Sequence, residues 1–371
     1  MKAPFSDRLA EDMVDLLGGM VDRQASDLHL VADRPPVYRV HGRLCPTGAN
    51  PLAPDVVRGM VTSVIPPRLR ERMLRDDLKD MDFSVRVEHD GRPVRFRANV
   101  FLAQGAMGGC FRLIPSEIPT LEWTSFPPPL EERIVKERNG LILVTGVAGS
   151  GKTTTLAVLV NILNRAGGYR IITIEEPVEY LFTPAPDSVV TQREVGTDTD
   201  SFYDGLRSGL RQDPNVMLVG EIRDRETAQM ALSAAETGHL IFATLHTRDA
   251  KGAITRITDL FPRDSQDDVR TQLALSLRYV ISQHLLPSAD PQEKRQLALE
   301  VLYVNSAVRS AIRFGKIESI DTALQTGKRD GMFTLDDDLC RLVGEGRITP
   351  QVAAEYANDP NVVARARPPM S

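Results

Sequence analysis

The sequence predicts an α/β protein in which a small α+β domain precedes a larger domain built on a parallel sheet. In the first 114 residues, short strand-like runs surround helical segments, which favours an α+β arrangement. From residue 141 onward, short apolar runs alternate with helical stretches, and this βαβ rhythm is typical of a doubly wound sheet. A length of 371 residues also indicates two domains.

The first domain is predicted over residues 1–114. Apolar side chains at helical spacing indicate an amphipathic helix at 6–22, and one or two further helices are expected at 54–76. Strands are predicted at 27–31, 36–44, 82–88, 94–102 and 108–114. The segment 115–129 contains five prolines, so we expect it to be a stiff linker between the domains.

The second domain is predicted over residues 130–304. Its apolar runs are expected to be buried strands at 141–146, 170–174, 215–220 and 239–245. A helical region is predicted at 305–360, with helices at 306–314, 318–326, 333–345 and 349–357. The remaining segment, 361–371, is expected to be a disordered tail.

Composition excludes several classes of protein. Hydrophobic residues make up 42% and charged residues 26%, an ordinary mix that can bury a core without disulfides. The three cysteines, Cys45, Cys110 and Cys340, lie far apart, which argues against a structural zinc site. The N-terminus is charged too early for a signal peptide, and no apolar run reaches the length of a membrane span. We therefore expect a soluble protein with no direct membrane span.

No nucleic-acid partner is expected. The net charge is −5, whereas proteins held by phosphate contacts usually show a basic face. One basic run, from Arg68 to Lys79, is interrupted by Glu71, Asp76 and Asp77, so we interpret it as a solvated helix face. Aromatic residues make up only 5%, which is few for stacking on bases.

The segment from Gly146 to Thr153 fits the pattern GxxxxGK[ST] of a phosphate-binding loop. An apolar strand precedes it and a helix follows, which is the context that this pattern requires. Glycines let backbone N–H groups surround phosphate oxygens, and the helix start adds its positive dipole end. Lys152 can reach the β- and γ-phosphates of ATP, and the Thr153 hydroxyl can hold Mg²⁺. The predicted nucleotide-binding residues are Gly146, Gly149, Ser150, Gly151, Lys152, Thr153 and Thr154.

A group of carboxylates follows the predicted strand at 170–174. Glu175, Glu176 and Glu179 lie at the carboxyl end of this strand, the edge that faces the nucleotide in a doubly wound sheet. One of them can orient the attacking water or take its proton. A solvated acidic loop is the alternative interpretation.

Two other predicted strands also end on polar residues. The run at 215–220 leads to Glu221, the usual shape of a Walker B strand, with Gly220 in place of the usual aspartate. Glu221 is therefore predicted to act alone, near Mg²⁺ and its water shell. His246 ends the predicted strand at 239–245, where the γ-phosphate would be sensed, although a lone histidine is more often a structural hydrogen-bonding residue.

These features at these spacings resemble the secretion-type P-loop ATPases of type II secretion, type IV secretion and type IV pili, the GspE/PilT family. The run Glu-Glu-Pro-Val-Glu is similar to that family's aspartate box, and Thr237–Thr247 is similar to its histidine box. The resemblance implies that Glu179 is the catalytic glutamate, Glu221 the Walker B glutamate and His246 the histidine-box residue. Glu176 stands where the family usually has aspartate.

Within this family, the resemblance to the PilT-type retraction ATPases covers nearly the whole chain. The matching segments are 25–30, 35–42, 192–196, 206–214, 325–332 and 334–336. The resemblance implies a PAS-like α+β N-terminal domain, a RecA-like P-loop ATPase domain with C-terminal helices, and a hexameric ring. In such rings, arginines of the N-terminal domain close on the γ-phosphate, and Arg97 and Arg112 match those positions. Arginine suits this role because its fork neutralises phosphoryl charge. The alternative is that both are ordinary surface residues of strands.

The resemblance implies a homohexameric, ATP-hydrolysing motor that drives type IV pilus retraction and hence twitching motility. Such a motor is expected to be cytoplasmic and to act at the inner membrane through a pilus platform protein. A pilus-extension or type II/IV secretion ATPase is the runner-up. Those proteins usually carry an additional N-terminal domain and a four-cysteine zinc insertion, neither of which we find in this sequence. A nucleic-acid translocase is a further alternative, but the sequence shows no basic patch that would support it. A non-catalytic scaffold would be expected to lose Lys152 or the carboxylates, and all of them are present.

Overall fold

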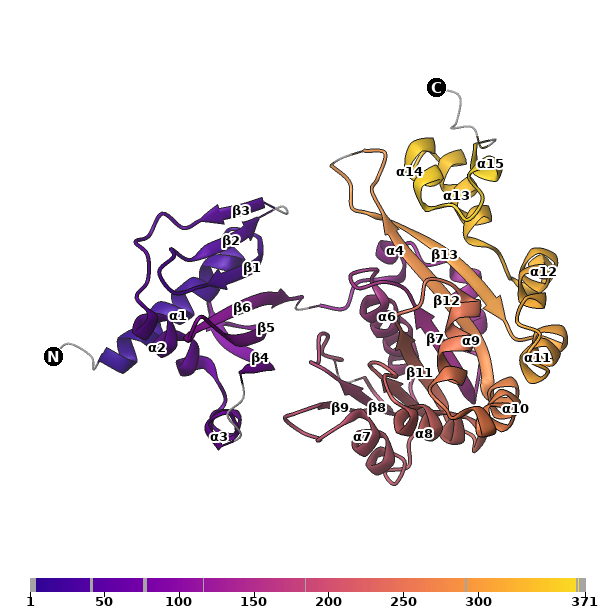
Figure 1. The fold of residues 1–371 in the computed structure, drawn as a ribbon, viewed down its shortest axis with the longest axis horizontal. Helices are drawn as coiled ribbons and strands as arrows, with labels where there is room; N and C mark the ends of the chain where they lie inside the picture. The colour runs from indigo at the N-terminus through magenta and orange to yellow at the C-terminus, as the bar shows by residue number, and fades with distance from the viewer. Residues whose placement is uncertain are drawn as a thin grey trace. The chain divides into compact units, whose positions relative to one another are not determined.

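The computed structural model describes residues 5–40, 43–75, 79–115, 117–183, 185–290, 292–364 and 366. They form two compact units (Figure 1). The first contains the described part of residues 1–117 together with the short segments 176–181 and 194–198, and the second contains the rest. Both units combine helices with a sheet, so the α/β class predicted from the sequence is confirmed.

The first unit is built on a six-stranded sheet in the order β3-β2-β1-β6-β5-β4, with antiparallel pairs. The strands are β1 (Ala25–Leu30), β2 (Val37–Val40), β3 (Arg43–Pro46), β4 (Asp80–His89), β5 (Arg92–Ala103) and β6 (Ala106–Ile114). Helices α1 (Phe5–Asp22), α2 (Pro54–Val64) and α3 (Pro67–Arg75) complete the unit. The buried core joins Met13 and Leu17 of α1 to Phe83, Phe96 and Phe111 of the sheet.

Side chains alternate between the two faces of this sheet because successive residues of a strand point to opposite sides. In β4, the buried residues are every second one, including Met81, Phe83, Val85 and Val87. The apolar face therefore packs into the core, and the residues between these positions form a polar face.

The second unit contains a seven-stranded sheet in the order β13-β12-β7-β11-β10-β8-β9 (Figure 1). Its strands are β7 (Gly140–Thr145), β8 (Arg170–Glu175), β9 (Val189–Glu194), β10 (Val216–Val219), β11 (Leu240–Leu245), β12 (Leu277–Leu286) and β13 (Gln296–Tyr303). β12, β7, β11, β10 and β8 are parallel to their neighbours in this series, while β13 pairs with β12 in the antiparallel sense. The apolar runs of the sequence predict β7, β8, β10 and β11, whereas β9, β12 and β13 were not predicted.

Helices separate several of these strands along the chain. They are α6 (Lys152–Ala166), α7 (Phe202–Gly209), α8 (Arg225–Glu236), α9 (Ala250–Asp259) and α10 (Gln266–Ser276). The core contains Leu156 and Leu159 of α6 together with Ile142 and Val144 of β7 and Phe242 of β11. All six residues of β7 are buried, as are all six of β11, which explains their continuous apolar sequences.

The proline-rich segment is partly helical in the structure. It contains α4 (Leu121–Thr124) and the start of α5 (Pro128–Ile134), and the second unit begins at Ile118. Phe126 lies in the core of this unit and is 3% exposed. The structure thus groups residues 118–129 with the second unit, whereas the sequence analysis begins that domain at residue 130.

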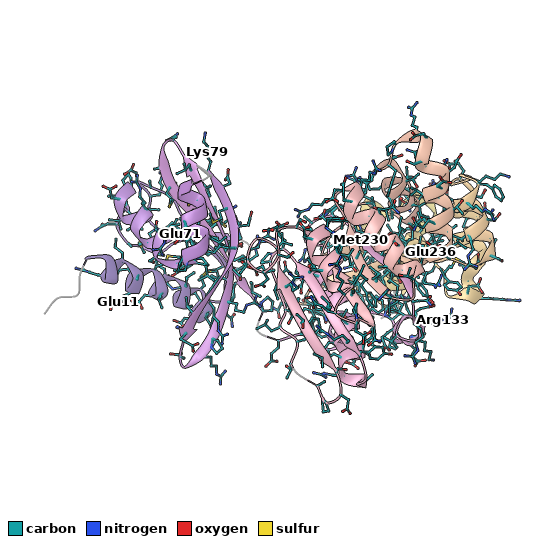
Figure 2. All side chains as sticks on the ribbon, turned by 90° about the horizontal axis from the view of Figure 1, so that it is seen from below. Glu11, Glu71, Lys79, Arg133, Met230 and Glu236 are labelled. Carbon is teal, nitrogen blue, oxygen red and sulfur yellow. The ribbon has the colours of Figure 1, made fainter. Side chains whose placement is uncertain are left out.

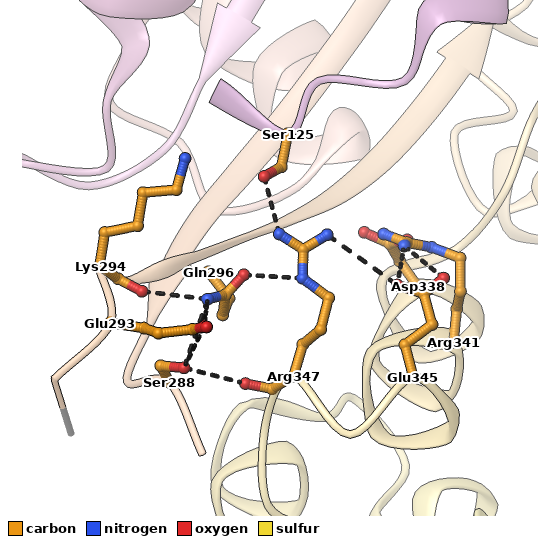
Figure 3. Close-up of polar contacts among 9 residues, drawn as sticks. All are labelled: Ser125, Ser288, Glu293, Lys294, Gln296, Asp338, Arg341, Glu345 and Arg347. Atoms are coloured by element: carbon orange, nitrogen blue, oxygen red, sulfur yellow. Dashed lines mark hydrogen bonds and ion pairs between the residues drawn. The ribbon is translucent and has the colours of Figure 1, made fainter. Parts of the chain in front are cut away.

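The C-terminal part of the second unit is helical. Its helices are α11 (Ser306–Arg313), α12 (Ser319–Thr326), α13 (Leu335–Gly344), α14 (Pro350–Tyr356) and α15 (Pro360–Val363). α15 includes residues 361–363 of the segment that we expected to be a disordered tail. Residues 365 and 367–371 of that segment lie outside the described residues. Arg347, after α13, donates to Ser125 Oγ at 2.7 Å and to Gln296 Oε1 at 2.8 Å (Figure 3). These bonds fasten the C-terminal helices to Ser125, the residue that follows α4, and to Gln296 of β13.

Among the described helices, none combines the length and the apolar character that crossing a membrane requires.

Candidate nucleotide-binding site

The phosphate-binding loop connects β7 to α6 in the second unit. Gly146 and Gly151 have φ angles of 144° and 88°, a region that favours glycine. At Gly146, a side chain is also excluded by space, because a Cβ atom would lie 2.4 Å from the Gln283 carbonyl oxygen. The sequence therefore needs glycine where the chain leaves the strand and where it enters the helix.

Lys152 is the first residue of α6 and is buried. Its Nζ donates to the carbonyl oxygens of Gly146 at 2.7 Å and Val147 at 3.1 Å, so the ammonium group lies inside the loop. Thr153 and Thr154 follow in the first turn of the helix, where backbone N–H groups have no partner within the helix. These residues place one full positive charge and the positive end of a helix dipole at the same point.

Glu221 and His246 follow neighbouring parallel strands, β10 and β11, and β11 also pairs with β7. Because parallel strands end at the same edge of a sheet, these residues and the phosphate loop meet there. The Nε2 atom of His246 lies 3.2 Å from Glu221 Oε1, and its Nδ1 atom lies 3.3 Å from Lys152 Nζ. Lysine can only donate, so Nδ1 accepts and Nε2 carries the proton that faces Glu221.

The turns that carry these side chains are fixed by the helices that follow them. Asp224 caps α8 by accepting a hydrogen bond from Thr227 N at 2.7 Å. Asp249 caps α9 by accepting one from Gly252 N at 2.6 Å. Such caps define where a helix starts, so they limit the turn after β10 and the turn after β11 to a few residues each.

Arg223 is a partner of this group that the sequence analysis did not select. Its Nε donates to Glu221 Oε2 at 2.7 Å, and its guanidinium lies 5.7 Å from the centre of the Phe202 ring. Glu221 thus contacts a cation on one oxygen and the His246 imidazole on the other. An arginine two residues after the predicted Walker B glutamate was the available signal for this contact.

The structure separates the three carboxylates of the aspartate-box segment. Glu175 is buried at the end of β8 and accepts hydrogen bonds from Thr173 Oγ1 at 2.6 Å and Gln192 Nε2 at 3.2 Å. Glu176 and Glu179 fall in the segment 176–181, which groups with the first unit. The catalytic role of Glu179 therefore stays a prediction.

Arg97 and Arg112 lie on the polar face of the first unit. A row of registered residues crosses four strands of this sheet, from Asp27 through Arg112 and Arg97 to Ser84. Arg112 Nε donates to Asp27 Oδ1 at 2.7 Å, and Arg97 lies 3.7 Å from an oxygen of Asp82. The side chain of Arg112 is 67% exposed, whereas that of Asp27 is 4% exposed. The buried carboxylate thus holds one nitrogen of an arginine whose other nitrogens extend outward.

The ionisation of this pair follows from the same contacts. Burial alone would raise the pKa of Asp27, but hydrogen bonds from Arg112 and Ser26 outweigh burial and lower it. The hydrogen bond to Asp27 is the main reason that the pKa of Arg112 is raised, and the negative charge of Glu179 contributes weakly in the same direction. Both groups therefore stay charged near neutral pH.

A family model described as "Type II/IV secretion system protein" matches residues 75–331. The chain belongs to this family. It is 40% identical to the type IV pilus retraction ATPase PilT of Pseudomonas aeruginosa, over 94% of this chain and 99% of that protein. It is 41% identical to a twitching motility protein of Neisseria gonorrhoeae, over 87% of this chain and 84% of that protein. The uncharacterized protein YggR of Escherichia coli is equally similar, at 41% over 91% of this chain and all of that protein.

The fold is also similar to a solved member of the family. A crystal structure of the pilus retraction motor PilT with bound ADP aligns with a TM-score of 0.84 and 40% identity, over 95% of this chain and 98% of that chain. The predicted resemblance to the PilT-type retraction ATPases is confirmed, and with it the N-terminal domain plus P-loop ATPase domain predicted from the sequence.

Proposed function

We propose that this chain is the ATP-hydrolysing motor that retracts type IV pili and so drives twitching motility. The observation that carries the proposal is the contact chain Lys152–His246–Glu221, which joins the phosphate loop to the ends of β10 and β11. It occurs in a protein that is about as long as relatives named for pilus retraction and twitching motility and is 40–41% identical to them.

Lys152 and the first turn of α6 bind the phosphates of ATP in this proposal. Phosphate oxygens replace the carbonyl oxygens of Gly146 and Val147 as partners of Lys152 Nζ, which exchanges neutral acceptors for charged ones. The Thr153 hydroxyl and the Glu221 carboxylate would hold Mg²⁺, directly or through its water shell, and both offer the oxygen ligands that this ion prefers. When bound, Mg²⁺ neutralises charge on the β- and γ-phosphates.

Hydrolysis needs a base for the attacking water. We assign this role to Glu179, which takes a proton as the water oxygen bonds to the γ-phosphorus and the bond to the ADP oxygen breaks. His246 and Glu221 sense the γ-phosphate, since any change at Lys152 reaches Glu221 through one imidazole. Arg97 and Arg112 would neutralise charge on the transferred phosphoryl group.

The motor would act as a homohexamer on the cytoplasmic side of the inner membrane, with a pilus platform protein as its partner. This part rests on resemblance to the PilT-type ATPases. Direction of force does not follow from site geometry, because a domain motion biased by ATP can do work either way. Retraction is preferred over extension because relatives that are 40–41% identical to this chain are named for pilus retraction and twitching motility.

Phosphate release from Mg·ATP by the purified chain tests the catalytic part. Lys152→Ala removes the phosphate anchor and should lower turnover by orders of magnitude while the melting temperature stays close to that of the wild type. Lys136→Ala removes an exposed lysine and is the matched control. Near wild-type turnover of Lys152→Ala would contradict the assignment of the loop.

Deletion of the gene tests the cellular part. The deletion strain should assemble surface pili, in greater number than the parent, but should not retract them or crawl on surfaces. The wild-type gene should restore crawling, and the Lys152→Ala gene should not. A strain without pili would favour an extension motor, and a strain with normal pili but defective protein export would favour a secretion ATPase.

A further inference from the structure

Gln283 lies directly behind the phosphate loop. It belongs to β12, which runs parallel to β7 with Ser282 opposite Thr145, the last residue of β7. Gln283 is therefore the β12 residue at the level where β7 ends and the loop begins. Its side chain is fully buried, at 0% exposure.

Gln283 contacts the loop at its beginning and its end. Its Nε2 donates to the Ser150 carbonyl oxygen at 2.6 Å. A Cβ atom on Gly146 would lie 2.4 Å from the Gln283 carbonyl oxygen, and one on Gly151 would lie 3.3 Å from Gln283 Nε2. The backbone and side chain of Gln283 thus pack against three residues of the loop: Gly146, Ser150 and Gly151.

The bond to Ser150 determines how the next peptide group is oriented. A carbonyl oxygen only accepts, so the amide nitrogen of Gln283 must be the atom that faces it. In a planar trans peptide, the C=O of Ser150 and the N–H of Gly151 point in opposite directions. Because Gln283 holds the carbonyl on the β12 side, it also holds the N–H of Gly151 away from β12. N–H groups directed inward in this way bind phosphate in such loops.

Gln283 and Ser150 each have a side-chain oxygen without a hydrogen-bond partner among the described residues. Gln283 Oε1 and Ser150 Oγ are buried and make no hydrogen bond to any residue that the structure describes. Buried side-chain oxygens are nearly always paired, so each exception calls for an explanation. A fully buried glutamine with an unpaired oxygen is not explained by packing alone.

We propose that Gln283 is a positioning residue that holds the Ser150–Gly151 peptide in the orientation that binds the β-phosphate of ADP or ATP. The side chain of Gln283 donates to the Ser150 carbonyl oxygen, so it acts through the backbone of Ser150 and Gly151. The inference rests on the nucleotide binding of the proposed function and adds a residue from a strand outside the motifs that define the site.

The test compares nucleotides with and without a β-phosphate on the full-length chain. Binding of the fluorescent analogue mant-ADP with Mg²⁺ is titrated, and unlabelled ADP and AMP are then used as competitors. Gln283→Leu keeps the approximate volume and removes the donor. It should weaken ADP binding about tenfold, the effect of losing one buried hydrogen bond, and leave AMP binding within about twofold. Gln283→Met repeats the comparison with an unbranched side chain.

Ser282→Ala is the control for general damage to β12. Ser282 is also fully buried, and its Oγ accepts a hydrogen bond from Thr145 Oγ1 at 3.0 Å. The alanine substitution removes this bond. This variant should lower the melting temperature without changing the preference for ADP over AMP. A merely structural role of Gln283 predicts the same behaviour for Gln283→Leu.

Three results would overturn the inference: a folded Gln283→Leu variant that binds ADP like the wild type, equal weakening of ADP and AMP, or loss of folding in both Gln283→Leu and Gln283→Met. The last result would make the contact a requirement of folding. Failure of the wild type to bind mant-ADP would instead contradict the proposed function.

Discussion

The imidazole of His246 joins Glu221 to Lys152, with its Nε2 atom 3.2 Å from Glu221 Oε1 and its Nδ1 atom 3.3 Å from Lys152 Nζ. One ring therefore links the turn after β11 to the phosphate loop and to the turn after β10. With the proton on Nε2, the imidazole accepts a hydrogen bond from Lys152 and donates one to Glu221. A phosphate that draws Lys152 away removes one of these two contacts.

His246 and Glu221 should therefore behave as a unit in catalysis. His246→Ala and Glu221→Gln should each lower kcat at least tenfold, and the double variant should resemble the more damaged single variant. The measurement is a double-mutant cycle on steady-state phosphate release.

His239 provides the control for that cycle. Its Nδ1 atom lies 3.0 Å from the Ala234 carbonyl oxygen, a local contact at the end of α8. Combining His239→Ala with Glu221→Gln should give effects that multiply. If the His246 and Glu221 effects multiply as well, the two residues do not act together.

Glu179→Gln should be the most damaging of three matched substitutions in the aspartate-box segment. The amide keeps the shape but cannot accept a proton, so ATP should still bind while turnover falls by roughly 10²- to 10⁴-fold. Glu175 is buried and already accepts from Thr173 and Gln192, so Glu175→Gln should act mainly on stability. Single-turnover hydrolysis and ATP binding are compared for Glu175→Gln, Glu176→Gln and Glu179→Gln. A larger loss of turnover in Glu176→Gln would move the base to that residue.

The sequence was most informative where local pattern and chemistry coincide. Fully buried parallel strands give continuous apolar runs, so β7 and β11 could be predicted. The glycine and lysine pattern predicted a phosphate-binding loop between a strand and a helix, and the structure has β7 and α6 on either side of it. The bond between Ser150 and Gln283 joins residues 133 positions apart, and that between Arg112 and Asp27 joins residues 85 apart. No local pattern indicates such contacts, because they depend on which strands become neighbours.

Phe126 shows the same limit at the domain boundary. Its surroundings are rich in proline and suggest a linker, yet its ring is buried in the core of the second unit. We expect a fragment of residues 118–371 to be more stable than one of residues 130–371, which lacks Phe126 and the bond from Arg347 to Ser125 (Figure 3). The loss of a buried phenylalanine costs about 3–5 kcal/mol, so the melting temperatures should differ by roughly ten degrees.

Both fragments should still bind ADP. They should hydrolyse ATP poorly, because neither contains Arg97 or Arg112. Equal melting temperatures would show that residues 118–129 add nothing to the fold. Full activity in either fragment would show that the first unit supplies no catalytic group.

Glu300 should make stability depend on pH. This carboxyl group of β13 is 6% exposed and accepts from Ala250 N, at the start of α9, at 2.9 Å. Burial, with smaller contributions from the charges of Asp249 and Asp321, raises the pKa of Glu300 from 4.5 to about 7. Between these values the unfolded chain loses the proton and the folded chain keeps it. Protonated Glu300 therefore makes its full contribution to the free energy of unfolding below pH 4.5. This contribution is about 3 kcal/mol at most and is lost as the pH rises to 7.

Glu300→Gln tests this directly because glutamine keeps an acceptor for Ala250 N and cannot ionise. The variant should melt close to the wild type at pH 5 and several degrees above it at pH 8, where the wild type holds a buried negative charge. Glu236→Gln, at an exposed position of α8 (Figure 2), is the control and should shift the melting temperature equally at both values. A difference between Glu300→Gln and wild type that stays constant from pH 5 to pH 8 would mean that Glu300 titrates like an exposed glutamate.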